Sequence, residues 1–73
     1  MSSPVRVECY AGHDYPQRPV AFWWQGQRLV VVAVRSEARL PDGKRFVVET
    51  DAEQVFEINY NQIDDMWTVR DIS

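Results

Sequence analysis

The sequence contains little cysteine and no long apolar run, and each of these features excludes a class of protein. Its 73 residues include one cysteine, Cys9, which has no partner in the chain for a disulfide. Small secreted domains usually carry several disulfides, so we expect a cytoplasmic protein that folds by packing alone. The longest apolar run, residues 29–34, is far too short for a membrane span, and the first residues lack the pattern of a signal peptide. We therefore expect no membrane contact.

The chain also lacks the residue sets that catalysis and metal binding require. His13 and Asp14 follow Cys9, but their spacing fits no strong catalytic motif, and one His with one Cys is too few for structural zinc. Residues 59–65 supply oxygen ligands without the spacing or turn glycine of a calcium loop. The three glycines are isolated, so no phosphate-binding loop is present. The sequence predicts no enzyme, catalytic residue, cofactor, metal site or small-molecule substrate.

The negative charge is small in total and unevenly distributed. The formal net charge is −3, made up of +3 in residues 1–45 and −6 in residues 46–73. Nonspecific binding to phosphates requires clustered cations, whereas the basic residues here are scattered among acidic ones. A nucleic-acid-binding small β-barrel is therefore the alternative function rather than the favoured one. It would use five arginines: Arg6, Arg18, Arg28, Arg35 and Arg45.

What the sequence does contain is alternation of apolar and polar residues along almost its whole length, with no sustained helical period. Turn residues separate the alternating segments, at Gln25-Gly26 and at residues 40–44, 50–54 and 59–65. We expect one domain, residues 1–73, of the all-β class. The predicted architecture is a small antiparallel curled sheet or SH3-like barrel of five to six strands.

The register of each predicted hairpin follows from the length of its loop. A two-residue turn at 25–26 places Trp24 opposite Gln27 and Trp23 opposite Arg28. A three-residue loop at 51–53 places Phe46 and Val48 on one face with the apolar residues of the following strand. We expect the core to contain five aromatic residues: Phe22, Trp24, Phe46, Phe56 and Trp67. Leu29, Val31 and Ala33 are expected to share the face of Phe22 and Trp24.

The segment 28–36 differs from the others because it is apolar on both faces. A strand that is apolar on both faces is usually central in a sheet, strongly bent between two sheet halves, or covered by a partner. On its second face, Trp23 either shields Val30 and Val32 or contacts a partner. Trp and Arg are enriched at interfaces, which favours a protein-interaction module that binds a protein partner or forms a homodimer. The candidate interaction face consists of Trp23, Arg28, Val30, Val32 and Val34.

The order of landmark residues also resembles a known family. The landmarks are Phe22-x-Trp24-x-Gly26-x-Arg28-Leu29-x-Val31, then Phe46-x-Val48, Phe56-x-Ile58 and Asp65-x-Trp67-x-Val69. Over residues 19–72 they resemble a small family of uncharacterised bacterial domains, a domain of unknown function. They are also similar to the C-terminal region of some Y-family DNA polymerase-like mutagenesis proteins. The resemblance implies a bacterial protein linked to DNA damage tolerance and defines no binding residue. Trp23 departs from the family pattern, where that position is usually polar or basic.

Overall fold

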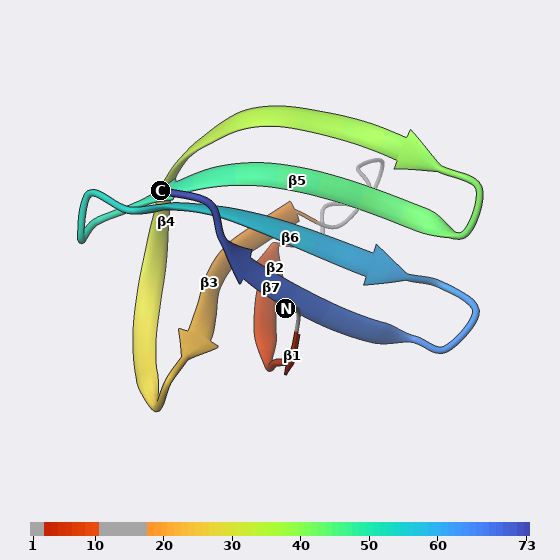
Figure 1. The fold of residues 1–73 in the computed structure, drawn as a ribbon, viewed down its shortest axis with the longest axis horizontal. Coiled ribbons are helices and arrows are strands. Elements are labelled where there is room, and N and C mark those ends of the chain that lie inside the picture. The colour runs from red at the N-terminus through yellow and green to blue at the C-terminus, as the bar shows by residue number, and fades with distance from the viewer. Residues whose placement is uncertain (1–2, 11–17) are drawn as a thin grey trace.

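The computed structural model describes residues 3–10 and 18–73, and these residues form an antiparallel all-β fold (Figure 1). Across the described residues there is no helix with the length and apolar character needed to span a membrane. The strands are β1 Ser3–Pro4, β2 Val7–Tyr10, β3 Arg18–Trp24, β4 Gln27–Leu40, β5 Gly43–Thr50, β6 Val55–Asn61 and β7 Met66–Asp71. The all-β class and the antiparallel curled, barrel-like sheet predicted from the alternation are confirmed.

The curl of the sheet is bridged by the N-terminal segment. The strand order is β1-β7-β6-β5-β4-β3-β2, so β1 and β2 lie at opposite ends although they follow each other in sequence. The amide of Val5 donates to the carbonyl of Trp67 at 3.1 Å, whereas the carbonyl of Arg6 accepts from the amide of Trp23 at 3.0 Å. The segment 3–10 therefore joins β7 to β3. The segment thus covers the outer edges of β7 and β3 along the residues with which it pairs.

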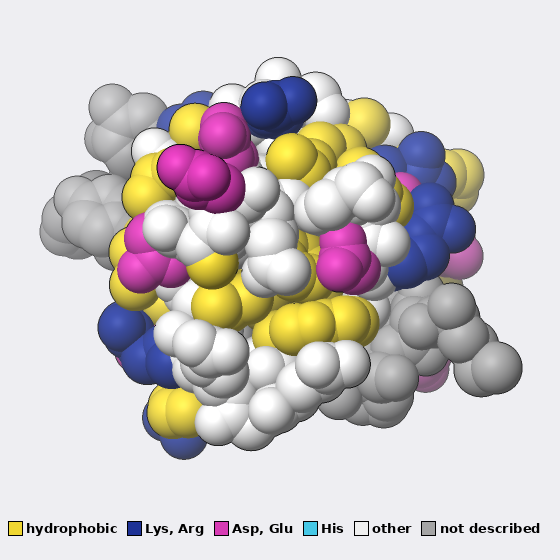
Figure 2. All heavy atoms as spheres, turned by 60° about the vertical axis from the view of Figure 1, so that its left-hand side comes forward, with side chains coloured by type: hydrophobic (Ala, Val, Ile, Leu, Met, Phe, Trp, Pro, Cys, Tyr) yellow, Lys and Arg dark blue, Asp and Glu magenta, His cyan; other side chains and the backbone are white. Residues whose placement is uncertain are grey.

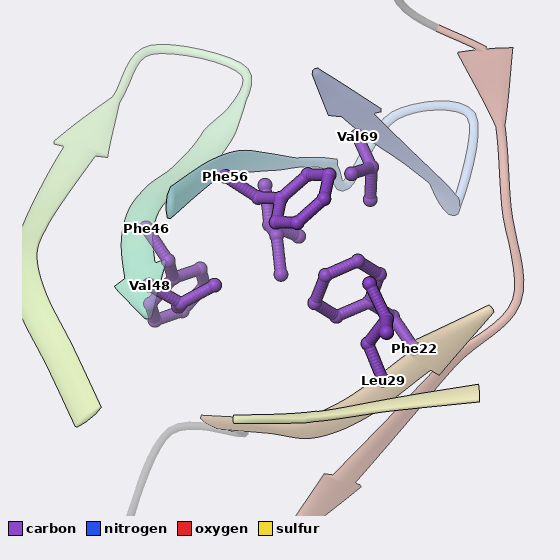
Figure 3. Packing of buried hydrophobic residues seen from close by; sticks show 7 residues of the cluster. Phe22, Leu29, Phe46, Val48, Phe56 and Val69 are labelled. Atoms are coloured by element: carbon purple, nitrogen blue, oxygen red, sulfur yellow. The ribbon is translucent and has the colours of Figure 1, made fainter. Parts of the chain in front are cut away.

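The first hairpin has the register that its turn predicts. Gln25 and Gly26 both have positive φ angles, 51° and 78°, as the two central residues of a type I′ turn require. Phe22 pairs with Leu29, Trp23 with Arg28 and Trp24 with Gln27. Phe22 and Leu29 are buried, and their side chains point into the molecule (Figure 3). The Gln-Gly turn thus sets which tryptophan faces the interior.

The loop between β5 and β6 also has the predicted length. Thr50 and Gln54 are joined by a backbone hydrogen bond of 2.9 Å, which leaves residues 51–53 as the loop. Glu53 has a φ of 60°, as expected of the last residue of a three-residue hairpin loop. The buried Thr50 hydroxyl accepts hydrogen bonds from the amides of Ala52 and Gln54. Phe46 consequently pairs with Ile58 and Val48 with Phe56, as expected.

Strand β4 is where the sequence prediction fails in part. Its pairing with β5 shifts register between Val31 and Ala33, and again between Val34 and Ser36. Each shift adds a residue on β4 and reverses the alternation beyond it. Ala33 is therefore exposed rather than on the core face, and Val34 packs against the core rather than lying on the outer face.

The core fills the space between the two halves of the curled sheet (Figure 3). Phe56 makes edge-to-face contacts with Phe22, with ring centroids 5.1 Å apart, and with Trp24 at 5.2 Å. Trp24 and Trp67 are only half-buried and pack against the cluster from its margin. The fully buried cluster consists of Phe22, Leu29, Phe46, Val48, Phe56, Ile58 and Val69. Three of the five predicted core aromatics are thus central and two are marginal.

Candidate interaction surface

Trp23 lies on the outer face of β3, directly across from Arg28 on β4. Its side chain is half-buried, and its indole Nε1 is buried without a hydrogen-bond partner among the described residues. Arg28 is exposed, and its Nε donates to Glu8 Oε2 at 2.6 Å. This contact lowers the pKa of Glu8 and raises the pKa of Arg28. Arg28 therefore links β4 to β2 by an ion pair beside Trp23.

The three valines of the candidate face lie in different environments. Val30 is half-buried, its amide donates to Asp51 Oδ1 at 3.4 Å, and its carbonyl accepts from the Asp51 amide at 3.0 Å. Val32 has 60% of its surface exposed. Val34 packs against the core because of the register shift before it. The predicted face is therefore divided, and Val32 is its exposed apolar member.

A groove opens where β3 and β4 diverge. Their pairing ends at Ala21 and Val30, so residues 18–20 and 31–34 separate beyond that point. The groove has a volume of about 290 Å³. Val20 and Val32 line it with 41% and 60% of their surfaces exposed. Two exposed valines therefore lie beside the diverging strands, and Val20 is one that the sequence analysis did not select.

Figure 2 shows how apolar and charged groups share one side of the molecule. Hydrophobic side chains reach the surface in the middle of this view, and acidic and basic side chains lie around them. An apolar patch with a charged border is the usual composition of a protein contact surface.

The arginines of the alternative function are spread over the sheet and paired with glutamates. Ion-pair distances are 3.8 Å for Arg18 to Glu37, 3.5 Å for Arg35 to Glu49 and 3.3 Å for Arg45 to Glu57. Together with the Arg28–Glu8 pair, four of the five arginines have a carboxylate neighbour. Paired charges produce a weaker positive potential than clustered free cations, which phosphate binding requires. The geometry favours a mixed surface over a nucleic-acid groove.

Glu57 is the centre of the largest of these charge networks. Its side chain is only 14% exposed and accepts hydrogen bonds from Arg70 at 2.6 Å and from the side-chain amide of Asn59 at 3.1 Å. Arg45 forms an ion pair with it at 3.3 Å. The hydrogen bond from Asn59, followed by the two arginines, holds the pKa of Glu57 below its ordinary value although burial acts to raise it. The ionised carboxylate therefore ties β5, β6 and β7 together on their outer face.

We expect Glu57→Gln to reduce the free energy of unfolding by about 1 kcal/mol at pH 7, because charge-assisted hydrogen bonds are lost. A carboxyl group whose pKa is depressed on folding stabilises above its unfolded pKa of about 4.3, and this contribution is lost as pH falls through the folded pKa. Urea unfolding of both proteins between pH 7 and pH 3 measures it. The difference should shrink at low pH, and a constant difference would contradict the assignment.

Another depression of the surface lies beside the β4–β5 and β6–β7 turns. It has a volume of about 510 Å³ and is lined in part by Leu40, Pro41 and Met66.

Strand β6 continues to Asn61, although the sequence analysis expected a loop from residue 59. The side-chain oxygen of Asn61 accepts the amides of Ile63 and Asp64, at 2.9 and 3.1 Å. The polar residues of 59–65 thus stabilise the turn between β6 and β7 through their own hydrogen bonds.

Cys9 is half-buried on β2, and burial raises the pKa of its thiol, which reduces the thiolate fraction. His13 and Asp14 lie outside the described residues. Among the residues that the structure describes, no three His, Cys, Asp or Glu side chains are grouped to hold a metal ion. The described geometry gives no argument for a catalytic or metal centre.

Comparison with known proteins adds no assignment. No family model, no curated protein and no solved structure matches this chain. The resemblance to the bacterial domain family and to polymerase-like mutagenesis proteins therefore stays a prediction from the landmark residues.

Proposed function

We propose that the chain is a protein-interaction module that binds a second copy of itself along the free side of β4. We call this side the open edge of β4, meaning residues 31–40 on the side away from β5. Pairing with β3 ends at Val30, and no other described strand pairs with the open edge. In Figure 1 the green half of β4 forms the outer border of the sheet beside β5. This edge, which none of the described strands covers, is the observation that carries the proposal.

An unpaired strand beside an apolar groove is suited to a β-strand partner. Backbone amides and carbonyls supply affinity when an extended strand adds to a sheet edge, and neighbouring side chains supply selectivity. Val32 and Val20 provide apolar contacts at one end of the open edge. A second copy is the proposed occupant because each copy brings both the unpaired edge and the exposed valines.

The test is sedimentation velocity of the full chain between about 10 μM and about 1 mM, the range in which a small transient interface associates. We expect a monomer–dimer equilibrium, and we expect Val32→Ser to weaken it severalfold because an exposed apolar contact is lost. The fold should be unaffected because Val32 is 60% exposed.

Ile63→Ser is the matched control, because Ile63 is an exposed apolar residue (74%) in the turn between β6 and β7. It should leave the dimer constant unchanged. A strict monomer at about 1 mM would overturn the proposal. Equal effects of both substitutions would show that the dimer does not contact the exposed-valine end of the open edge.

Two parts of the sequence prediction remain separate from this proposal. Nucleic-acid binding would be supported by affinity for a single-stranded oligonucleotide that falls steeply with salt and falls again when Arg35 and Arg45 are neutralised. A role in bacterial DNA damage tolerance, with a polymerase-like partner, rests on the family resemblance alone. Neither contributes to the argument from the open edge.

A further inference from the structure

The open edge of β4 carries a charge pattern that complements itself, and this inference rests on the proposed function. Residues 36–40 read Ser-Glu-Ala-Arg-Leu and pair with β5 without interruption, from Ser36 opposite Val47 to Leu40 opposite Gly43. The second register shift lies before Ser36, so this stretch is regular. A regular stretch is the part of the edge to which another strand can add.

The direction of the backbone groups follows from the hairpin. Leu40 and Gly43 are paired and flank the two-residue loop Pro41-Asp42, so they exchange both backbone hydrogen bonds with each other. Hydrogen-bonded and non-hydrogen-bonded pairs alternate along an antiparallel ladder. Arg39 and Glu37 are therefore in non-hydrogen-bonded positions toward β5. Their amides and carbonyls point to the open edge.

We infer that two copies pair their β4 strands antiparallel about a two-fold axis at Ala38. In this register Glu37 of each copy lies directly opposite Arg39 of the other. The two outward-facing pairs would form four backbone hydrogen bonds and two ion pairs. In the same register the turn Pro41-Asp42 of the second copy would lie beside Val34, at the groove that Val32 lines. Ala38 lies opposite itself, and its small side chain suits the close spacing of a non-hydrogen-bonded pair. The arrangement is isologous, as a two-fold dimer requires.

Other registers are less favourable. A centre at Glu37 opposes Glu37 to itself and Arg35 to Arg39, and a centre at Arg39 opposes two arginines. The centre at Arg39 also places Glu37 opposite Pro41, which has no amide to donate. A centre at Ser36 opposes Glu37 to Arg35, but Arg35 is the extra residue of the register shift. Only the Ala38 register combines opposite charges with a regular backbone.

The charges already on this face also favour the approach of a carboxylate from a second copy. Arg39 lies directly opposite Lys44 on β5, so two cations are neighbours across the strands. Like charges directly opposite destabilise a sheet, and an added carboxylate beside them relieves the repulsion. Glu37 of the second copy would be placed beside Arg39. Among the described residues, Glu37 has a single long ion-pair contact, 3.8 Å from the exposed Arg18.

The experiment is a charge exchange followed by sedimentation velocity. Glu37→Arg opposes two arginines in each pair and Arg39→Glu opposes two glutamates, so each should weaken the homodimer by about tenfold. The double variant Glu37→Arg/Arg39→Glu restores opposite charges and should recover the wild-type constant. A mixture of the two single variants should form a heterodimer, because each pair then joins an arginine to a glutamate.

Asp64→Arg is the matched control for Glu37→Arg, since it also replaces an acidic residue by arginine, at an exposed position of the β6–β7 turn. Amide exchange gives a second readout, in which protection of the Glu37 and Arg39 amides rises with protein concentration. A dimer that is indifferent to both charge reversals would overturn this register and leave the proposed function standing. Failure of the double variant to recover would favour the Ser36 register. A monomer throughout would overturn both.

Discussion

Phe56→Ala is expected to lower the free energy of unfolding by about 3–5 kcal/mol, the range for removing a large buried aromatic side chain. Phe56 is fully buried and lies between Phe22 and Trp24, with ring planes at 71° and 65° to its own. Its loss removes apolar burial and both edge-to-face contacts, and leaves a cavity between the two halves of the sheet.

The measurement is urea unfolding followed by tryptophan fluorescence and by circular dichroism. Small domains have stabilities toward the lower end of about 5–15 kcal/mol, so Phe56→Ala should be partly unfolded in buffer. Phe56→Leu keeps most of the volume and should remain folded, with a loss of about 1.5 kcal/mol. Ile63→Ala, at a 74% exposed position, should be neutral. A Phe56→Ala protein as stable as wild type would refute the central position of this ring.

The two hairpins could be predicted from the local sequence because the length of the turn and the alternation of side chains in the adjoining residues determine the register. Gln25-Gly26 sets the β3–β4 register, and the three-residue loop at 51–53 sets the β5–β6 register. Both were predictable from the sequence because a one-residue slip would have turned an apolar set to solvent. The all-β class follows from the same consistency.

The course of β4 was not predictable from this pattern. Residues 29–34 are apolar at every position, so a residue inserted into the ladder leaves no mark in the alternation. The register shifts arise because β4 leaves β3 and continues beside β5, which is a property of the whole sheet. Val34 consequently packs inward while Val32 remains exposed. Trp23 and Arg28 were placed correctly across from each other, because they precede the first shift.

The open edge of β4 was missed for a related reason. Arg35, Glu37 and Arg39 read as an ordinary solvated segment, since the sequence does not show which strands have a neighbour on both sides. Charged residues on an exposed strand normally discourage edge-to-edge association. Here their order is complementary in one antiparallel register, so the same charges select a partner instead of excluding all partners.

Gly43→Ala is expected to destabilise the protein by about 3 kcal/mol because the obstacle is backbone. Gly43 is buried at the start of β5, and a Cβ added to it would overlap the carbonyl oxygen of Tyr60. Its φ lies outside the left-handed region, so the need for glycine here is steric rather than conformational. The substitution must separate β5 from β6, which also strains the hydrogen bond from the Gln62 amide to the Asp42 carbonyl.

Gly26 provides the contrast that tests this explanation. A Cβ there meets nothing within 4 Å, but the φ angle of Gly26 is 78°. Gly26→Ala should therefore lower the free energy of unfolding by about 1 kcal/mol through backbone strain. Gly26→Asn should lower it less, since asparagine tolerates that conformation. At Gly43, asparagine should be as damaging as alanine because both add the same atom. Denaturant unfolding of the four variants, with amide exchange at Gln62, separates the two causes. Recovery of stability by Gly43→Asn would mean that conformation, not the close approach of Tyr60, fixes this glycine.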